Sequence, residues 1–138
     1  MPDTIIVLVD IAHSDSAAAL LAKARARYDG ADLHVAYVMP YGFYSYVEPY
    51  VSKESQDNAA ERAHAELGKL MAQSGLDGAR RHVLRGGIGD QILELAKVTD
   101  ASVLVLNAVR SGSHLSTLGT HAAQIVRHAP CDVHVMRN

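Results

Sequence analysis

Val103-Leu-Val-Leu106 is a short apolar run, followed by a loop of small polar residues and then by Gly119-Thr120, which opens the run His121-Ala-Ala-Gln-Ile-Val126. This order predicts a buried strand, a loop and the start of a helix. The first N–H groups of a helix have no partners within it and carry partial positive charge, so they favour an anion such as phosphate. The stretch therefore predicts an α/β unit with an anion site beyond the end of its strand.

Strand-like and helix-like runs alternate along the whole chain. Strands are predicted at residues 4–10, 33–39, 79–85, 102–106 and 131–136, and helices at residues 14–28, 54–74, 92–98 and 118–128. We expect Ser14 or Asp15 to cap the first helix, residues 86–90 to form a turn, and Val98 to line the third helix. The polar third strand belongs at a sheet edge. The alternation predicts one α/β domain, residues 1–138, with a doubly wound parallel sheet of strand order 3-2-1-4-5 and four helices.

Composition excludes several classes of protein. Hydrophobic residues make up 49% of the 138 residues, and 13 basic residues stand against 15 acidic ones. There is no basic excess to attract nucleic acid or an anionic membrane surface. No apolar run approaches the ~20 residues of a membrane span, and Met1-Pro-Asp-Thr lacks the build of a signal peptide. The single cysteine, Cys131, cannot form an internal disulfide, so we expect a soluble cytoplasmic protein.

Asp10 and Asn107 end the first and fourth predicted strands, which are neighbours in this strand order. Ligands of open parallel sheets bind beyond the carboxyl ends of the strands, where the winding direction reverses. A carboxylate there can accept two hydrogen bonds from hydroxyl groups, such as those of a ribose. The alternative role for Asp10 is to cap the following helix. The second polar side chain across the crevice favours a ligand site.

The loop before the fourth helix offers further anion ligands. Gly119 allows close approach of the backbone, Thr120 adds a hydroxyl, and Arg110 either pairs with a phosphate or is a solvated charge. An ordinary loop followed by a capped helix is the alternative. The chain contains neither Gly-x-x-x-x-Gly-Lys nor Gly-x-Gly-x-x-Gly, so the pattern alone does not identify a phosphate site.

No pattern of a metal centre or of catalytic residues emerges. His114, His121 and His128 are spaced by seven residues, too far along a helix for one metal ion. Cys131 lies between a proline and a strand, where we expect a buried, unreactive thiol. The aromatic residues 41–51 are interpreted as a loop that packs on the protein or on a partner, or that stacks on a base.

Taken together, the residues resemble the universal stress protein family. The resemblance runs in order through residues 5–10, 33–38, Gly86 with residues 92–96, residues 103–106, Gly119-Thr120 and residues 125–135. Its most specific parts are Asp10 and Val126-Arg-His-Ala-Pro-Cys131. It implies a Rossmann-like domain, a cytoplasmic stress-response role, and binding of ATP or a related adenine nucleotide as a switch, with or without Mg²⁺ and with at most slow hydrolysis.

The resemblance also implies which residues bind. The nucleotide-binding positions carried over are Val9, Asp10, Val38, Leu106, Asn107, Arg110, Gly119, Thr120 and His121. Asp10 would contact the ribose, the Val38 backbone the adenine, and the last four residues the phosphates. The family is commonly dimeric, which implies a homodimer through Asp132, Val133, His134, Val135 and Met136. Such pairing would cover the unpaired backbone groups and apolar side chains of an edge strand.

The glycine loop departs from the pattern of ATP-binding members. Asn107 and Arg110 occupy the positions of the first two glycines, and eight residues separate Arg110 from Gly119. This shortened loop resembles the F/G-type bacterial branch, whose members can bind adenine nucleotide. A nucleotide-binding switch and a dimeric interaction module without nucleotide are therefore the two functions to separate. A flavodoxin-like receiver or flavin carrier fits less well, because the acidic cluster and strand-end lysine of a receiver are missing.

Overall fold

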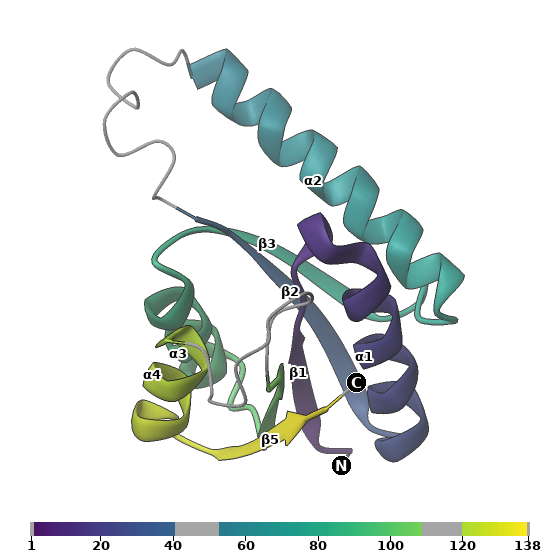
Figure 1. The fold of residues 1–138 in the computed structure, drawn as a ribbon, viewed down its shortest axis with the longest axis vertical. Coiled ribbons are helices and arrows are strands. Elements are labelled where there is room, and N and C mark those ends of the chain that lie inside the picture. The colour runs from purple at the N-terminus through teal and green to yellow at the C-terminus, as the bar shows by residue number, and fades with distance from the viewer. Residues whose placement is uncertain (1, 41–52, 109–119, 138) are drawn as a thin grey trace.

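The computed structural model describes residues 2–40, 53–108 and 120–137. Its strands form one parallel sheet in the order β3-β2-β1-β4-β5, which confirms the predicted fold class and strand order (Figure 1). The strands are β1 (Thr4–Leu8), β2 (Asp32–Pro40), β3 (Arg80–Gly86), β4 (Val103–Asn107) and β5 (Asp132–Met136). The helices are the short 3-10 helix η1 (Ile11–His13), α1 (Ser14–Arg27), α2 (Lys53–Gln73), α3 (Ile88–Val98) and α4 (Thr120–His128).

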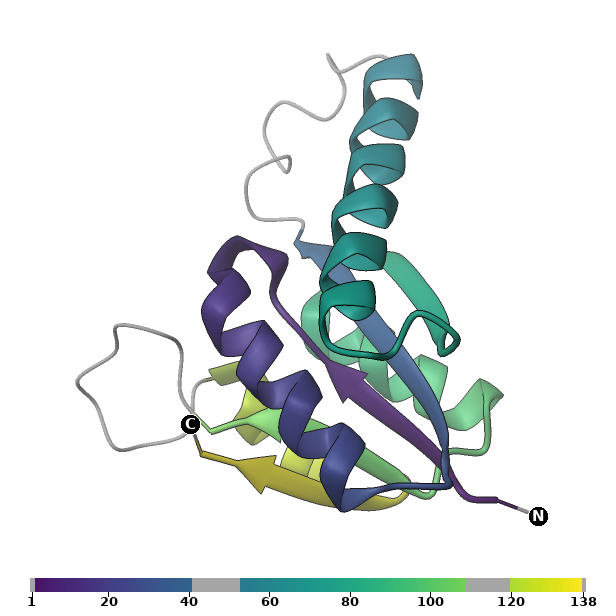
Figure 2. The same ribbon diagram turned by 90° about the vertical axis from the view of Figure 1, so that its right-hand side faces the viewer.

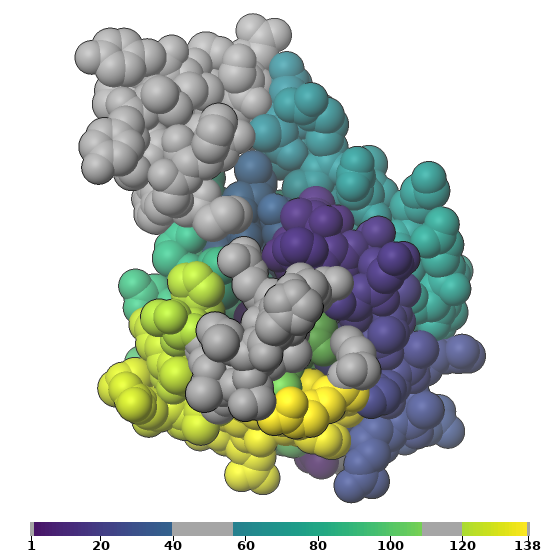
Figure 3. Space-filling model, in the orientation of Figure 1, coloured from purple at the N-terminus to yellow at the C-terminus, as the bar shows by residue number. Residues whose placement is uncertain are grey.

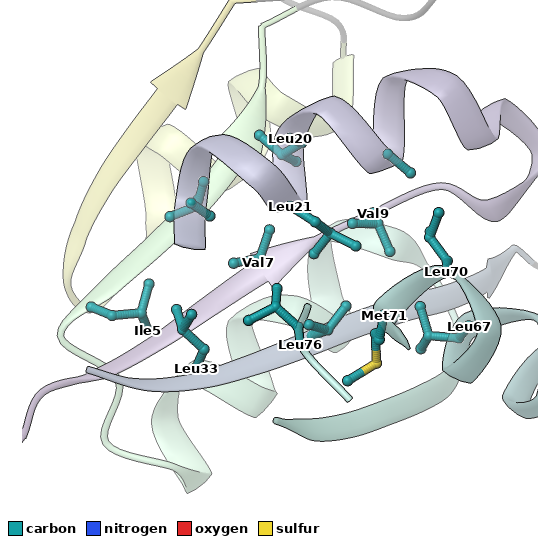
Figure 4. Close-up of a cluster of buried hydrophobic side chains, with 14 of the residues drawn as sticks. Ile5, Val7, Val9, Leu20, Leu21, Leu33, Leu67, Leu70, Met71 and Leu76 are labelled. Carbon is teal, nitrogen blue, oxygen red and sulfur yellow. The ribbon is translucent and has the colours of Figure 1, made fainter. Parts of the chain in front are cut away.

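Helices cover both faces of the sheet, with α1 and α2 on one side and α3 and α4 on the other (Figures 1 and 2). Alternate side chains of a strand point to opposite faces, so each central strand serves two cores. Val7 of β1 belongs to the core under α1 and α2, together with Leu21 and Leu67 (Figure 4). Ile6 belongs to the core under α3 and α4, together with Ile92. Burial on both faces explains why the β1 run is apolar throughout.

The polar strand β3 lies at the edge of the sheet, as predicted. Its first residues, Arg80 and Arg81, are exposed, and the Arg81 guanidinium donates a hydrogen bond to the His64 carbonyl oxygen of α2 at 3.2 Å. Charged side chains on an edge strand oppose pairing with other chains. The other edge is β5, whose residues Val133 and Val135 are only partly buried.

Three local predictions were wrong. Neither Ser14 nor Asp15 caps the first helix, because Asp10 caps η1 instead and α1 follows η1 without a side-chain cap. Helix α3 begins at Ile88, inside the segment predicted as a turn. Val98 is 73% exposed. It lies two residues after the buried Ala96, and two residues rotate a helix by about 200°, which turns Val98 away from the core.

Two glycines, Gly86 and Gly89, lie near the start of α3. Gly86 has a φ of 138°, a conformation that side-chain-bearing residues rarely adopt, and it redirects the chain directly after β3. Gly89 lies within α3, where a Cβ atom would come 2.3 Å from the Gln124 amide oxygen of α4. Gly89 therefore lies in the helix, next to the Gln124 side chain of α4, and does not form a turn.

Candidate functional site

Asp10 follows β1 at the carboxyl edge of the sheet. The backbone N–H of Val9 donates to the Ala36 carbonyl oxygen at 3.0 Å, and the chain then leaves β2. The Ala12 N–H donates to Asp10 Oδ1 at 3.0 Å, which caps η1. The other oxygen, Oδ2, lies 3.9 Å from His13 Nε2, and the Asp10 side chain is 45% exposed. Asp10 therefore caps η1, and a large part of its carboxylate surface remains exposed to solvent.

Asn107 ends β4, the strand next to β1. The two strands pair through Val7 and Val105, so Asp10 and Asn107 both follow paired residues at the same edge. Asn107 is partly buried and lies in register with Met136 of β5. The structure therefore places these two strand ends side by side at the carboxyl edge of the sheet, where the strand order predicts ligand binding.

The apolar site candidates have their side chains in the core. Val9, Val38 and Leu106 are 4%, 3% and 2% exposed, and Figure 4 shows Val9 among the side chains under α1 and α2. A ligand can reach these residues only through their backbone. Val38 is well placed for this, because β1 pairs with β2 only as far as Ala36. In a parallel ladder, alternate residues direct their backbone groups to the same neighbouring strand. Like the backbone groups of Ala36, the backbone groups of Val38 are therefore directed to the side of β1, and they lie past its end.

Thr120 and His121 are the first residues of α4 and are exposed. Because α4 connects two parallel strands, it begins at the carboxyl edge, and the space-filling view shows α1 and α4 on either side of one face of the molecule (Figure 3). The Gln124 side-chain amide donates to Asp90 Oδ1 of α3 at 3.2 Å, which ties the two helices together near their starts. Arg110, Gly119 and the aromatic residues 41–51 lie outside the described residues.

Within residues 2–40, 53–108 and 120–137, we find little support for a metal site or a reactive thiol. No group of three His, Cys, Asp or Glu side chains in these ranges could hold a metal ion. Cys131 is partly buried, and burial together with the Asp132 carboxylate raises the pKa of its thiol, which disfavours the reactive thiolate. Within the same ranges, no helix combines the length and the apolar character that crossing a bilayer requires.

One polar cluster was not predicted from the sequence. Asp32, His34 and His82 lie in contact on β2 and β3. His34 is 4% exposed and is the only buried polar or charged side chain of the described residues. The only sign of this cluster in the sequence is His34 itself, a polar residue within the predicted strand 33–39. The partner on β3 becomes apparent only from the strand register.

Comparison with known proteins gives a consistent result. A model of the universal stress protein family matches residues 1–137. Universal stress protein G of Escherichia coli O157:H7 is 26% identical over 143 residues, which cover 99% of this chain and all of the relative. Among solved structures, UspA from Lactobacillus plantarum superposes with a TM-score of 0.72 at 26% identity, covering 98% of this chain and 97% of the other. A universal stress protein in complex with cAMP has a TM-score of 0.65 at 22% identity, with coverage of 99% and 97%.

Proposed function

Because the chain belongs to the universal stress protein family, we propose that it binds an adenine nucleotide at the carboxyl edge of β1 and β4 and acts as a nucleotide-dependent switch. The observation that carries this proposal is the partly exposed Asp10 carboxylate at the carboxyl edge of the sheet, where the winding direction reverses. A structural neighbour was solved in complex with cAMP, which is an adenine nucleotide.

Each part of the nucleotide would meet a suitable group. Asp10 Oδ2 would accept hydrogen bonds from the ribose hydroxyls while Oδ1 continues to cap η1. The Val38 backbone, which points past the end of β1, would recognise the adenine edge. The N–H groups at the start of α4, with Thr120 and His121, would face the phosphates, joined by Arg110 and Gly119. Leu106 and Asn107 would line the site between them.

The proposal includes no catalytic residue. Binding would stabilise one arrangement of the α4 end of the molecule, and hydrolysis would be slow at most. A switch of this kind needs only a difference in nucleotide affinity between two conformations. The second candidate, an interaction module without nucleotide, keeps the same fold, and Asn107 and Arg110 at the two glycine positions favour it.

Isothermal titration with Mg-ATP tests the proposal directly. We expect saturable binding at one site per chain, with ADP, AMP and cAMP competing because they share the adenosine that Asp10 and Val38 would hold. GTP is the matched control, since it differs in the base edge that the Val38 backbone would read. An absence of binding heat at millimolar concentrations of all four adenine nucleotides would leave the interaction module as the function.

We further propose that the chain forms a homodimer through β5. This strand lies at the sheet edge, and its residues Val133 and Val135 are partly buried on the side of α3 and α4. On the other side, the Tyr28 hydroxyl and His134 Nδ1 lie 2.6 Å apart, which ties β5 to the end of α1. A second copy pairing along β5 would cover the remaining backbone groups.

Light scattering after size exclusion tests the dimer. We expect twice the chain mass at micromolar concentration, and a shift toward monomer in Val135→Lys, which places a charge beside the pairing edge. Val98→Lys, on the exposed part of α3, is the matched control and should remain dimeric. A wild-type protein of single-chain mass would contradict this proposal and leave nucleotide binding unaffected.

A further inference from the structure

A chain of hydrogen-bonding groups links Asp32, His34 and His82 at the end of the sheet opposite the proposed nucleotide site. Asp32 Oδ2 lies 3.1 Å from His34 Nε2, and His34 Nδ1 lies 2.9 Å from His82 Nε2. His34 and His82 belong to the neighbouring strands β2 and β3, where Ala36 is the register partner of His82. The contact therefore adds a side-chain link to the backbone pairing of β2 and β3, which runs from His34–Arg80 to Pro40–Gly86.

The two imidazole rings lie edge to edge. Their planes differ by 8° and their centroids are 5.1 Å apart. The centroids are almost as far apart as a nitrogen–nitrogen distance of 2.9 Å allows, which requires each ring centre to lie nearly on the line through the two nitrogens. The facing nitrogens therefore point at each other. A tetrahedral zinc ion bound by both rings would hold the two nitrogens roughly 3.3 Å apart and at an angle, so they would not point straight at each other. The geometry fits a direct N–H···N hydrogen bond.

Proton positions in the neutral pair follow from the donors available. A carboxylate only accepts, so His34 Nε2 carries a hydrogen and donates to Asp32. His34 Nδ1 is then an acceptor, and His82 Nε2–H donates to it. One added proton fits at the outer nitrogen of His82 with every hydrogen bond kept. A second proton would place hydrogens on both facing nitrogens and break the bond between the rings.

The surroundings oppose protonation of His82. Burial, the neighbouring His34 and the Arg80 guanidinium, in that order, lower the pKa of His82 from its usual 6.5. Asp32 is the counter-charge that contacts His34, and Asp3 lies near it, since its carbonyl accepts the Asp32 N–H at 2.9 Å. Helix α3 packs on this face of β2 and β3. Its titratable side chains, Asp90, Glu94 and Lys97, are all exposed.

We propose that Asp32, His34 and His82 form an acid-responsive link between edge strand β3 and β2. The link holds while the two imidazoles carry at most one added proton, and it breaks when both imidazoles are charged. In the unfolded chain His82 takes up a proton as the pH falls through about 6.5. The folded chain binds fewer protons, so stability is complete above this pH and is lost as the pH falls toward the lowered pKa of His82. The link makes the β3 edge the acid-sensitive part of the sheet.

Denaturant unfolding between pH 8 and pH 5 tests the link in the full chain. For each proton taken up on unfolding, the unfolding constant rises about tenfold per pH unit. We expect His82→Gln to flatten the pH dependence by up to this factor below pH 6.5, because the glutamine amide can donate to His34 and turn to accept from it, without titrating. His64→Gln, which removes an exposed histidine on α2, is the control and should keep the wild-type slope. A wild-type slope in His82→Gln contradicts the proposal.

Nuclear magnetic resonance of the wild-type protein gives a second test that needs no variant. We expect the nitrogen signals of His34 and His82 to show one added proton, shared by the pair, while the protein stays folded. Amide exchange protection should fall in β3 on acidification and persist in β5, the opposite edge. Two doubly protonated rings in the native protein, or equal loss of protection at both edges, would overturn the proposal.

Discussion

Replacing Asp10 by asparagine is expected to raise the dissociation constant for adenine nucleotide by about tenfold to a hundredfold. Hydrogen bonds to a charged group contribute about 1.5–3 kcal/mol, and each 1.4 kcal/mol is a factor of about ten in affinity. Asparagine keeps one side-chain oxygen for the Ala12 N–H, so the cap of η1 survives while the carboxylate is lost. Isothermal titration of the variant against wild type measures the effect.

Two further variants separate binding from folding. Asp10→Ala should lose nucleotide affinity to a similar extent and also lower the free energy of unfolding by about 1 kcal/mol, because it removes the cap. Asp15→Asn removes an exposed carboxylate from the first turn of α1 and should bind like wild type. If Asp10→Asn binds nucleotide as wild type does, Asp10 serves the cap alone and the ribose contact is wrong.

Replacing Ile6 by alanine is expected to lower the free energy of unfolding by about 2–5 kcal/mol. Ile6 lies in β1, the central strand, and is 0% exposed. It is part of the core under α3 and α4, which also contains Ile92 and Leu104. The loss combines the transfer free energy of the removed methyl groups with the cavity they leave. It would be a large fraction of the total stability of a domain, typically about 5–15 kcal/mol. Denaturant unfolding measures it.

Val98→Ala is the matched control for the core variant. It removes a valine that is 73% exposed, so its effect should stay within about 0.5 kcal/mol. A loss of less than about 1 kcal/mol in Ile6→Ala would mean that the core under α3 and α4 is not closed over β1.

The order and type of the elements were predictable because they follow from local patterns. Apolar runs such as residues 103–106 are buried on both faces in the middle of the sheet, and the polar run of β3 lies at its edge. In α2, Ala63, Leu67 and Met71 recur at every fourth residue, and all three are buried. Hydrophobic periodicity fixes these outcomes before any long-range contact is considered.

Details that depend on packing between elements were not predictable. Gly89 was predicted in a turn, yet it lies inside α3, where the end of the Gln124 side chain of α4 packs against it. Asp10 was considered as a ligand or a cap, and the structure shows it capping η1 while 45% of its side chain stays exposed. The packing of α4 on α3 decides the first case, and the short 3-10 helix that directly follows Asp10 decides the second.

The sequence by itself determined the alternation of elements, the strand order and the strand ends at which Asp10 and Asn107 lie, since periodicity and right-handed crossovers leave few other folds. Only the tertiary structure decided that His34 meets His82. These residues are far apart in the chain, and a shift of one residue in the register of β2 and β3 would turn one ring to the opposite face. That register is set jointly by the cores on both faces of the sheet, which is why no local pattern could indicate the link.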